Sequence, residues 1–569
     1  MKSAWALTGL VATAAAAAAA ATTNSSSCYA LPTDSDWPST SSWDTLNTTV
    51  GGRLIATVPV GSPCHDPNYD EVACLALQAE WTLASTHYDT SSSMMQEFWA
   101  NNSCDPFTDR TSACTLGNYV SYAVDVSGPD DIIATLNFAT TNNIRLVIRN
   151  TGHDYFGRST GTGALAIWTH NLKDTSLIEW SDANYTGQAL KMGAGVQGFD
   201  AVEAAAANNV MVLTGECPSV GLVGGYLQGG GHSILSTSYG MAADNLLQYE
   251  VITASGAYIN ASRTENSDLF WALSGGGGGS YAIVVSATVK AYESATTGGG
   301  TVTIVAALTT EENYTAAVTA FHALAPAMVD LGAAVSYELS SEYFVIDPVT
   351  IINSNASYVE NVVLGPWLAE LAALGITPYS QTYTTLDYYE HYAAYIGPLP
   401  EGHLAVESYQ FGSRLIPRSL LEDDPATFGE VLANATALGV TSAGSISSYA
   451  GNTSDQWNSV NPVWRDTIMQ LQLTLPWNES DTFADNVALQ TEMTDVIVPE
   501  FVAVTPDSGA YLNEASFMEE DWKTTFFGVN YDALLAIKEK WDPEGVFYAY
   551  KGVGSDAWTV AADGRMCPA

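Results

Sequence analysis

The fold is decided by the stretch Arg149-Asn150-Thr151-Gly152-His153-Asp154-Tyr155-Phe156-Gly157, the first loop, and by the second loop, Gly215-Glu216-Cys217-Pro218-Ser219-Val220-Gly221. Each loop follows an apolar run typical of a buried strand, at 144–149 and at 209–213. Glycine-rich loops leave backbone N–H groups open to a ligand, because no side chain stands in the way. Both loops are therefore expected to carry ligand-binding residues at the ends of buried strands.

The sequence on either side of the loops alternates between strand and helix patterns. The Thr/Gly-rich stretch 296–300 is typical of a domain boundary. A mixture of helices and strands follows it, so the chain is expected to have an α+β fold with at least two domains. Strands are predicted at 119–126, 144–149, 164–168, 189–192, 209–213, 246–259, 282–291, 333–338 and 344–352, and helices at 130–142, 196–208, 309–329, 366–374 and 531–541.

Several further motifs occur in a fixed order, and together with the two loops they resemble one family. They are Gly229-Gly230-Gly231, Tyr239-Gly240-Met241-Ala242-Ala243-Asp244-Asn245, Asp268-Leu269-Phe270-Trp271-Ala272, Asn530-Tyr531 and Asp542-Pro543. The chain resembles the berberine-bridge-enzyme-like FAD-linked oxidases of the vanillyl-alcohol-oxidase superfamily, and looks most like secreted fungal proteins of the isoamyl-alcohol-oxidase-like group. The resemblance implies a PCMH-type FAD-binding domain, built from the N-terminal part and the chain end, with an α+β substrate domain inserted between them.

This scheme divides the chain into five segments. Lys2, an apolar core from residue 4 and an alanine tract predict a signal peptide at 1–21. We expect an N-terminal extension with disulfides at 22–118, packed on the FAD domain. The FAD-binding domain is predicted at 119–295, the substrate-binding domain at 296–500, and the berberine-bridge-like segment that completes the FAD domain at 501–569.

The resemblance implies that FAD is attached at two points, with His153 on the flavin 8α-methyl group and Cys217 on C6. Taken separately, a histidine such as His153 is more often structural than an attachment site, and Cys217 could be a buried free thiol, so the joint pattern carries this prediction. The turn at 152–160 is expected to hold the FAD pyrophosphate through backbone N–H groups. The other residues assigned to FAD binding are Asn150, Thr151, Gly152, Asp154, Gly157, Arg158, Ser159, Gly221, Gly225, Gly231, Asp244, Val251 and Asn513.

Two of the four catalytic assignments follow from the family motifs. In the family, the position of Val220 lies beside the flavin face where oxygen reacts, and valine there accompanies oxidases while leucine accompanies dehydrogenases. Tyr511, with Asn513, takes the position of the tyrosine base of carbohydrate-oxidising relatives. Glu514 departs from that motif, because the relatives end it with tyrosine.

The other two catalytic assignments, Glu407 and Tyr409, alternate within 403–411. They are expected to point from a strand toward the flavin, and the alternative is a half-exposed strand face. A further departure is Gly224-Gly225-Tyr226, where the family commonly has Gly-Gly-His, and His232 follows the triple glycine instead. These departures concern the lining of the pocket rather than the cofactor.

The seven cysteines are an odd number, so one thiol is left over in a secreted protein. Cys217 is the expected free thiol because it alone lies in a glycine-rich segment. Cys64 with Cys74 and Cys104 with Cys114 would close short polar loops, and Cys28 would then pair with Cys567. Sequence does not fix the connectivity, so these pairs are hypotheses.

The formal net charge of −43 makes nucleic acid and anionic membranes poor partners, whereas neutral or cationic small molecules fit. The predicted function is a secreted FAD oxidase that takes hydride from an alcohol onto flavin N5 and passes the electrons to O2, giving hydrogen peroxide. The alternatives are an oligosaccharide oxidase, a secondary-metabolite oxidase acting on amines or phenols, and a flavin-bearing protein with little turnover. No metal site is predicted, and a monomer is expected.

Overall fold

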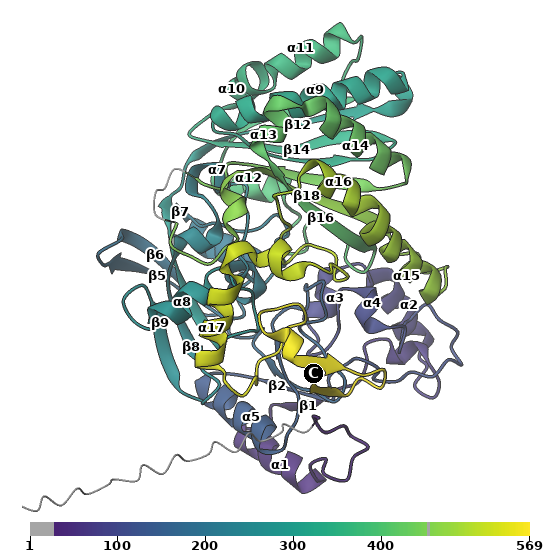
Figure 1. Cartoon of the computed structure of the whole chain (residues 1–569), viewed down its shortest axis with the longest axis vertical. Coiled ribbons are helices and arrows are strands. Elements are labelled where there is room, and N and C mark those ends of the chain that lie inside the picture. Colours follow the sequence, from purple (N-terminus) through teal and green to yellow (C-terminus); the bar gives the residue numbers. More distant parts are fainter. Residues whose placement is uncertain (1–27, 452–455) are drawn as a thin grey trace, which may run out of the picture.

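The structure is a computed structural model that describes residues 28–451 and 456–569 (Figure 1). The predicted signal peptide lies outside the described residues. In Figure 1 a sheet with a helix layer forms the upper part, and segments from both ends of the chain form the lower part. None of the helices in the described part of the chain is long and apolar enough to span a membrane.

The first loop leaves a four-stranded sheet in the order β1-β2-β4-β3. Strands β2, β4 and β3 are parallel, and α5 is the crossover helix between β2 and β3. Because β3 ends at Arg149, the first loop continues from the carboxyl end of a buried parallel strand. The elements are α1 (Thr40–Thr49), β1 (Leu54–Ala56), α2 (Glu71–Glu80), α3 (Ala84–Tyr88), α4 (Glu97–Ala100), β2 (Tyr122–Asp125), α5 (Pro129–Thr141), β3 (Leu146–Arg149) and β4 (Leu165–Trp168).

The second loop lies between α6 and β8, next to a five-stranded antiparallel sheet in the order β5-β6-β10-β8-β9. The central strand β10 is buried from Ile283 to Val289, so both of its faces are covered by other elements. The elements are β5 (Thr175–Ser181), β6 (Thr186–Gly193), α6 (Gly198–Ala206), β7 (Val210–Met211), η2 (Leu222–Tyr226), α7 (Ser236–Tyr239), β8 (Leu246–Ile252), β9 (Tyr258–Ser262), α8 (Ser267–Leu273), β10 (Ile283–Lys290) and β11 (Tyr292–Glu293).

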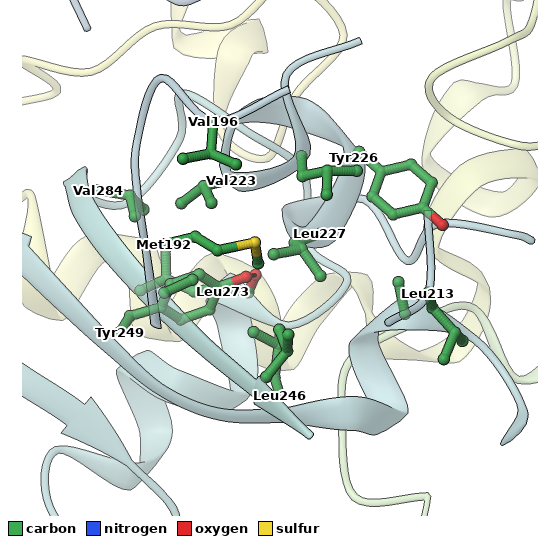
Figure 2. Packing of buried hydrophobic residues seen from close by; sticks show 14 of the residues in the cluster. Met192, Val196, Leu213, Val223, Tyr226, Leu227, Leu246, Tyr249, Leu273 and Val284 are labelled. Atoms are coloured by element: carbon green, nitrogen blue, oxygen red, sulfur yellow. Dashed lines mark hydrogen bonds between the residues drawn. The ribbon is translucent and has the colours of Figure 1, made fainter. Parts of the chain in front are cut away.

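One hydrophobic cluster joins this sheet to the second loop (Figure 2). Met192 and Tyr249 contribute from the sheet, and Leu273 from the end of α8. Val223 and Leu227 come from the turn that follows the second loop, and both are buried. The loop is therefore anchored in the core at the residues that follow it.

A seven-stranded antiparallel sheet forms the upper part, in the order β15-β12-β14-β13-β17-β18-β16. On β18, Leu471 and Leu473 are fully buried in the cluster formed with the covering helices, while Gln470 and Gln472 alternate with them and point to the opposite face. The elements are β12 (Thr296–Val305), α9 (Glu311–Asp330), β13 (Ala334–Leu339), β14 (Tyr343–Ile352), α10 (Ala356–Tyr358), α11 (Gly365–Ala373), β15 (Ser380–Asp387), α12 (Tyr388–Tyr395), β16 (Tyr409–Pro417), α13 (Arg418–Asp423), α14 (Pro425–Ala437), β17 (Thr441–Ile446), β18 (Thr467–Pro476), α15 (Phe483–Glu492) and α16 (Val498–Val504).

The chain end returns to the lower part. Helix α17 (Tyr531–Trp541) packs on α8, where Lys540 Nζ lies 2.5 Å from an oxygen of Asp268, and the hairpin of β19 (Trp558–Val560) and β20 (Met566–Pro568) follows. The disulfide Cys28–Cys567 joins the beginning of the described chain to its end. The other two predicted disulfides, Cys64–Cys74 and Cys104–Cys114, are also confirmed, and Cys217 is the free cysteine.

The stretch 296–300 opens strand β12, which along the chain is the first strand of the seven-stranded sheet, and its glycines allow close packing: a Cβ on Gly299 would lie 2.8 Å from the hydroxyl oxygen of Tyr395. Two sequence expectations are wrong in detail. The single strand expected at 246–259 is two strands, β8 and β9, that pair with each other. The segment 403–408 is not a strand, because Glu407 adopts φ +58°, and β16 begins at Tyr409.

Candidate functional site

A cavity of about 620 Å³ lies between the two loops and the polar face of the seven-stranded sheet. Its volume is in the range of small-molecule and cofactor sites. The C-terminal segment also contributes, through Tyr511, Asn513 and Glu514. Residues from three separate regions of the sequence thus form one site.

His153 and Cys217 lie close together at this cavity because both contact Ser219. The ring nitrogen Nε2 of His153 is 3.0 Å from Ser219 Oγ, and Cys217 Sγ is 3.5 Å from the same oxygen. Burial, followed by the charges of His87 and Arg149, lowers the pKa of His153 to about 3, so its imidazole is neutral. Burial raises the pKa of the Cys217 thiol.

Asp154 organises the first loop. Its carboxylate accepts hydrogen bonds from the backbone N–H groups of Phe156, Arg158 and Ser159, at 2.7 to 3.1 Å. These N–H groups are therefore used within the loop, and the expectation that the whole turn offers them to a pyrophosphate is wrong for these three. Arg158 reaches the C-terminal segment, donating from Nε to the carbonyl of Tyr550 and from Nη1 to the carbonyl of Leu512.

Most of the residues predicted for the site line the cavity. They are Asn150, Thr151, Gly152, His153, Asp154, Arg158, Ser159, Cys217, Val220, Gly221, Gly225, Glu407, Tyr409, Tyr511 and Asn513. Asn513 links two regions, since its Nδ2 donates to the carbonyl of Gly225 and to the hydroxyl of Tyr511.

Four residues assigned to FAD binding do not line the cavity, and each has a packing role. A Cβ on Gly157 would lie 2.4 Å from the ring of Trp99, and one on Gly231, at φ +72°, would lie 2.8 Å from the ring of Tyr226. Asp244 is buried and forms an ion pair with Arg465 at 2.8 Å. Val251 is an interior residue of β8 and is fully buried in the hydrophobic cluster that joins the five-stranded sheet to the second loop.

Two of the predicted bases lie in surroundings that do not suit the role. Tyr511 is buried, and its burial, followed by the charge of Glu514, raises the pKa of its hydroxyl far from neutrality. Glu407 is buried beside His87, with 3.8 Å between Oε1 and Nδ1. Its burial and the charge of Glu97 raise the pKa of Glu407 well above the ordinary value, which favours the protonated form that cannot act as a base.

The sheet contributes polar residues to the cavity that the sequence did not reveal. Ser336, Ser445 and Gln470 are cross-strand neighbours, as are Glu338, Ala443 and Gln472, and all six line the cavity. We call the five polar residues of this set, all except Ala443, the polar floor. Their signal in the sequence is the polar and apolar alternation of each strand, which requires the strand boundaries to be known.

His232 and Glu514 form a pair at the cavity that the sequence also did not reveal. Nε2 of His232 lies 3.2 Å from both carboxylate oxygens of Glu514, and both residues line the cavity. Burial favours the neutral ring, but the charge of Glu514 and its hydrogen bond outweigh burial and raise the pKa of His232. Both residues appeared in the sequence only as departures from the family motifs.

The unpartnered polar atoms of the site fit a large polar cofactor such as FAD. Asn150 Oδ1, Arg158 Nη2 and Gln228 Oε1 are buried and have no hydrogen-bond partner within the described residues. All three residues line the cavity, where they offer two acceptors and a positively charged donor to a ligand. Gly225 and Gly278 both line the cavity, and a Cβ on Gly278 would lie 3.2 Å from the Cα of Gly225, so the backbone itself forms part of the wall.

Comparisons with known proteins agree with this geometry. A family model for an FAD binding domain matches 120–262, and one for berberine and berberine-like proteins matches 510–554. The FAD-linked oxidoreductase ZEB1 of Gibberella zeae is 46% identical over 95% of both chains. The VAO-type flavoprotein oxidase VAO615 of Thermothelomyces thermophilus is 41% identical over 95% of this chain and 96% of that protein.

Solved structures show the same fold. The crystal structure of the VAO-type flavoprotein MtVAO615 from Myceliophthora thermophila C1 has a TM-score of 0.91 at 41% identity, over 95% of this chain and all of that one. The glucooligosaccharide oxidase of Acremonium strictum, at 20% identity, shares the fold with a TM-score of 0.64, over 86% of this chain and 99% of that one.

The fold and site thus define a flavin-dependent oxidoreductase with the PCMH-type FAD-binding architecture. The chain belongs to the VAO-type FAD-linked oxidoreductases with a berberine-bridge-like C-terminal segment.

Proposed function

We propose that this protein is a secreted oxidase whose FAD is bonded to both His153 and Cys217, and that it converts an alcohol to a carbonyl compound while reducing O2 to hydrogen peroxide. The observation that carries the proposal is the meeting of His153 and Cys217 at the hydroxyl of Ser219. Two residues that contact one hydroxyl can both reach the benzene ring of the same flavin, which carries C6 and the 8α-methyl group with one ring carbon between them.

The contact with Ser219 also selects the nitrogen of His153 that forms the bond. Nε2 is occupied by the hydroxyl, so Nδ1 is left for the flavin. The lowered pKa of His153 keeps a lone pair on the ring, which the formation of a bond to carbon requires. The glucooligosaccharide oxidase from Acremonium strictum has a 6-S-cysteinyl, 8α-N1-histidyl FAD, and this chain has the same two residue types at one site.

FAD, when bound, supplies a hydride acceptor and then a two-electron donor to O2. The chain's own residues hold it: Asn150, Arg158 and Gln228 offer their unpartnered atoms to its polar groups. Val220 lines the cavity three residues after Cys217, which suits a role in leaving room for O2.

The polar floor supports a substrate with hydroxyl groups. Glu338, Gln470 and Gln472 all belong to it, and such groups accept hydrogen bonds while the amides also donate them. Tyr343 and Tyr409 also line the cavity and offer aromatic faces on which a sugar ring can stack. These two observations favour the oligosaccharide oxidase as the second candidate function.

Secretion is supported by the predicted signal peptide and by three disulfides, which persist in oxidising compartments. We propose a monomer, with the small substrate and O2 as its partners.

The test divides the purified secreted protein into two portions: one is precipitated with acid, and the other, kept native, is assayed for peroxide with cellobiose, benzyl alcohol and a primary aliphatic alcohol. We expect flavin absorbance that remains in the pellet of the first portion, and peroxide from the second portion with at least one probe. Flavin that moves to the supernatant refutes covalent attachment. Bound flavin that none of the probes reduces refutes the alcohol oxidase.

A further inference from the structure

Glu514 and His232 are 282 positions apart in the sequence and meet in the cavity. His232 is buried, and the side chain of Glu514 keeps 27% of its surface exposed in the cavity wall. The backbone of His232 is fixed, because the hydroxyl of Tyr226 donates to its carbonyl at 2.8 Å. The pair is thus a carboxylate with access to the cavity, held by an imidazole that is itself buried.

The surroundings of His232 direct its proton to Glu514. Its other ring nitrogen, Nδ1, is buried with no hydrogen-bond partner among the residues that the structure describes. One face of the ring lies near Trp464, with 6.5 Å between centroids, and Tyr511 meets it edge-on at 5.4 Å. Nε2–H can therefore donate only to the two oxygens of Glu514.

The position of Glu514 is close to the proposed flavin attachment. Its charge acts on Cys217 and Tyr155, both of which line the cavity. The ionisable groups whose charges couple to this pair come from several elements, and they are Tyr155, Glu216, Cys217, Tyr226, Tyr449 and Tyr511. Between the two carboxylates that act on the buried imidazole, Glu514 and Glu216, Glu514 has the stronger effect.

We propose that Glu514 is the catalytic base that takes the proton of the substrate hydroxyl, and that His232 is the positioning residue that orients its carboxylate. This inference rests on the proposed function. The O–H bond breaks with its proton going to a Glu514 oxygen, while the carbon loses a hydride, with its electron pair, to FAD. A C=O double bond forms, and the two electrons with two protons finally convert O2 to hydrogen peroxide. General bases of this kind contribute roughly 10²- to 10⁴-fold to the rate.

The other acidic groups of the cavity are less suited. Glu338 accepts from the hydroxyl of Tyr343, and Glu216 accepts from Ser445 at 2.9 Å. Asp347 is the strongest rival, because burial raises its pKa to about 6 and it lines the same cavity. Asp347 lies on β14, where the charge of His403 lowers its pKa and the charge of Glu216 raises it. Among the described residues, no hydrogen bond or ion pair joins it to His232.

The experiment compares Glu514→Gln, His232→Gln and Asp347→Asn with a matched control, Glu520→Gln, which changes an exposed residue of the same segment. The flavin-reduction rate is measured by stopped flow across pH, without O2, with whichever of cellobiose, benzyl alcohol or a primary aliphatic alcohol reduces the wild-type protein fastest. We expect Glu514→Gln to lose about 10²-fold or more and to lose the fall in rate at acidic pH that an ionisable base causes. His232→Gln should lose less and keep that fall.

A second readout does not depend on activity. The pKa of His232, followed by NMR of labelled histidine, should fall in Glu514→Gln and remain at the wild-type value in Glu520→Gln, since only the first variant removes the charge that raises it. Flavin attachment is verified by mass in every variant.

The outcomes separate the two claims. If no probe reduces the wild-type protein, the proposed function fails and this inference fails with it. If wild type is active and Glu514→Gln keeps its rate within threefold, or if Asp347→Asn alone shows the large loss, the assignment of Glu514 is overturned while the oxidase stands. An unchanged His232 pKa in Glu514→Gln also overturns it.

Discussion

The imidazole of His153 and the hydroxyl of Ser219 lie 3.0 Å apart, and in the proposed attachment this contact leaves Nδ1 to form the bond to the flavin. Replacing Ser219 with Ala removes the contact, so the ring of His153 becomes free to rotate. Nε2 then competes with Nδ1 for the bond to the flavin. We expect a smaller fraction of protein with flavin on His153, measured by mass spectrometry of the intact chain and its peptides. Ser176→Ala, at an exposed position of β5, is the control. Full attachment in Ser219→Ala would show that the hydroxyl has no orienting role.

Buried Glu407 makes the stability of the protein depend on pH. Its pKa is raised in the folded state, so the folded protein keeps this proton while the unfolded chain releases it above about pH 4.3. The contribution of Glu407 to stability is therefore greatest in acid and decreases as the pH rises.

Glu407→Gln removes this dependence, because glutamine stays neutral. We expect equal melting temperatures for wild type and variant at pH 4, and a higher one for the variant at pH 8, with about 1.4 kcal/mol at most for each unit of pKa shift. Differential scanning calorimetry at both pH values measures this. The exposed Glu539→Gln serves as the control, and a difference that is the same at both pH values would contradict the buried proton.

Leu273 packs within the cluster that anchors the second loop. It is fully buried, so Leu273→Ala should reduce the free energy of unfolding by about 2–5 kcal/mol. Leu75→Ala, at a position of α2 that is 59% exposed, should change it by less than about 0.5 kcal/mol. Chemical denaturation of both variants tests the difference, and similar losses would show that Leu273 packs more loosely than the structure indicates.

Val220→Leu tests the route of O2. Leucine adds one carbon to the cavity wall beside the second loop, so we expect slower turnover with O2 than with an artificial electron acceptor, expressed as the ratio of the two rates. Val72→Leu, on the exposed surface of α2, provides the matched comparison. An unchanged ratio in Val220→Leu would remove Val220 from the oxygen pathway.

Sequence patterns predicted the features that depend on neighbours along the chain. The helix at 531–541 has the predicted bounds, because its pattern ends at Asp542-Pro543, where a helix cannot continue. The first loop follows a buried strand as expected. The packing role of glycines was not visible in the sequence, since the contact of Gly299 with Tyr395 depends on a residue that is far away in the chain.

Features that depend on distant residues were missed or assigned wrongly. The pairing of His232 with Glu514 requires two segments to meet that no local pattern connects. Glu407 was placed on a strand by its alternation with Tyr409, but its positive φ turns it toward His87 instead. Asp244 and Val251 were assigned to the cofactor although they serve packing, which becomes visible only with their partners.

The most direct test of the bicovalent attachment is the mass of the peptides that contain His153 and Cys217, measured on the purified protein after digestion without reduction. We expect one cross-linked species in which both peptides are joined through a single FAD. Two unmodified peptides, with Cys217 as a free thiol, would contradict it.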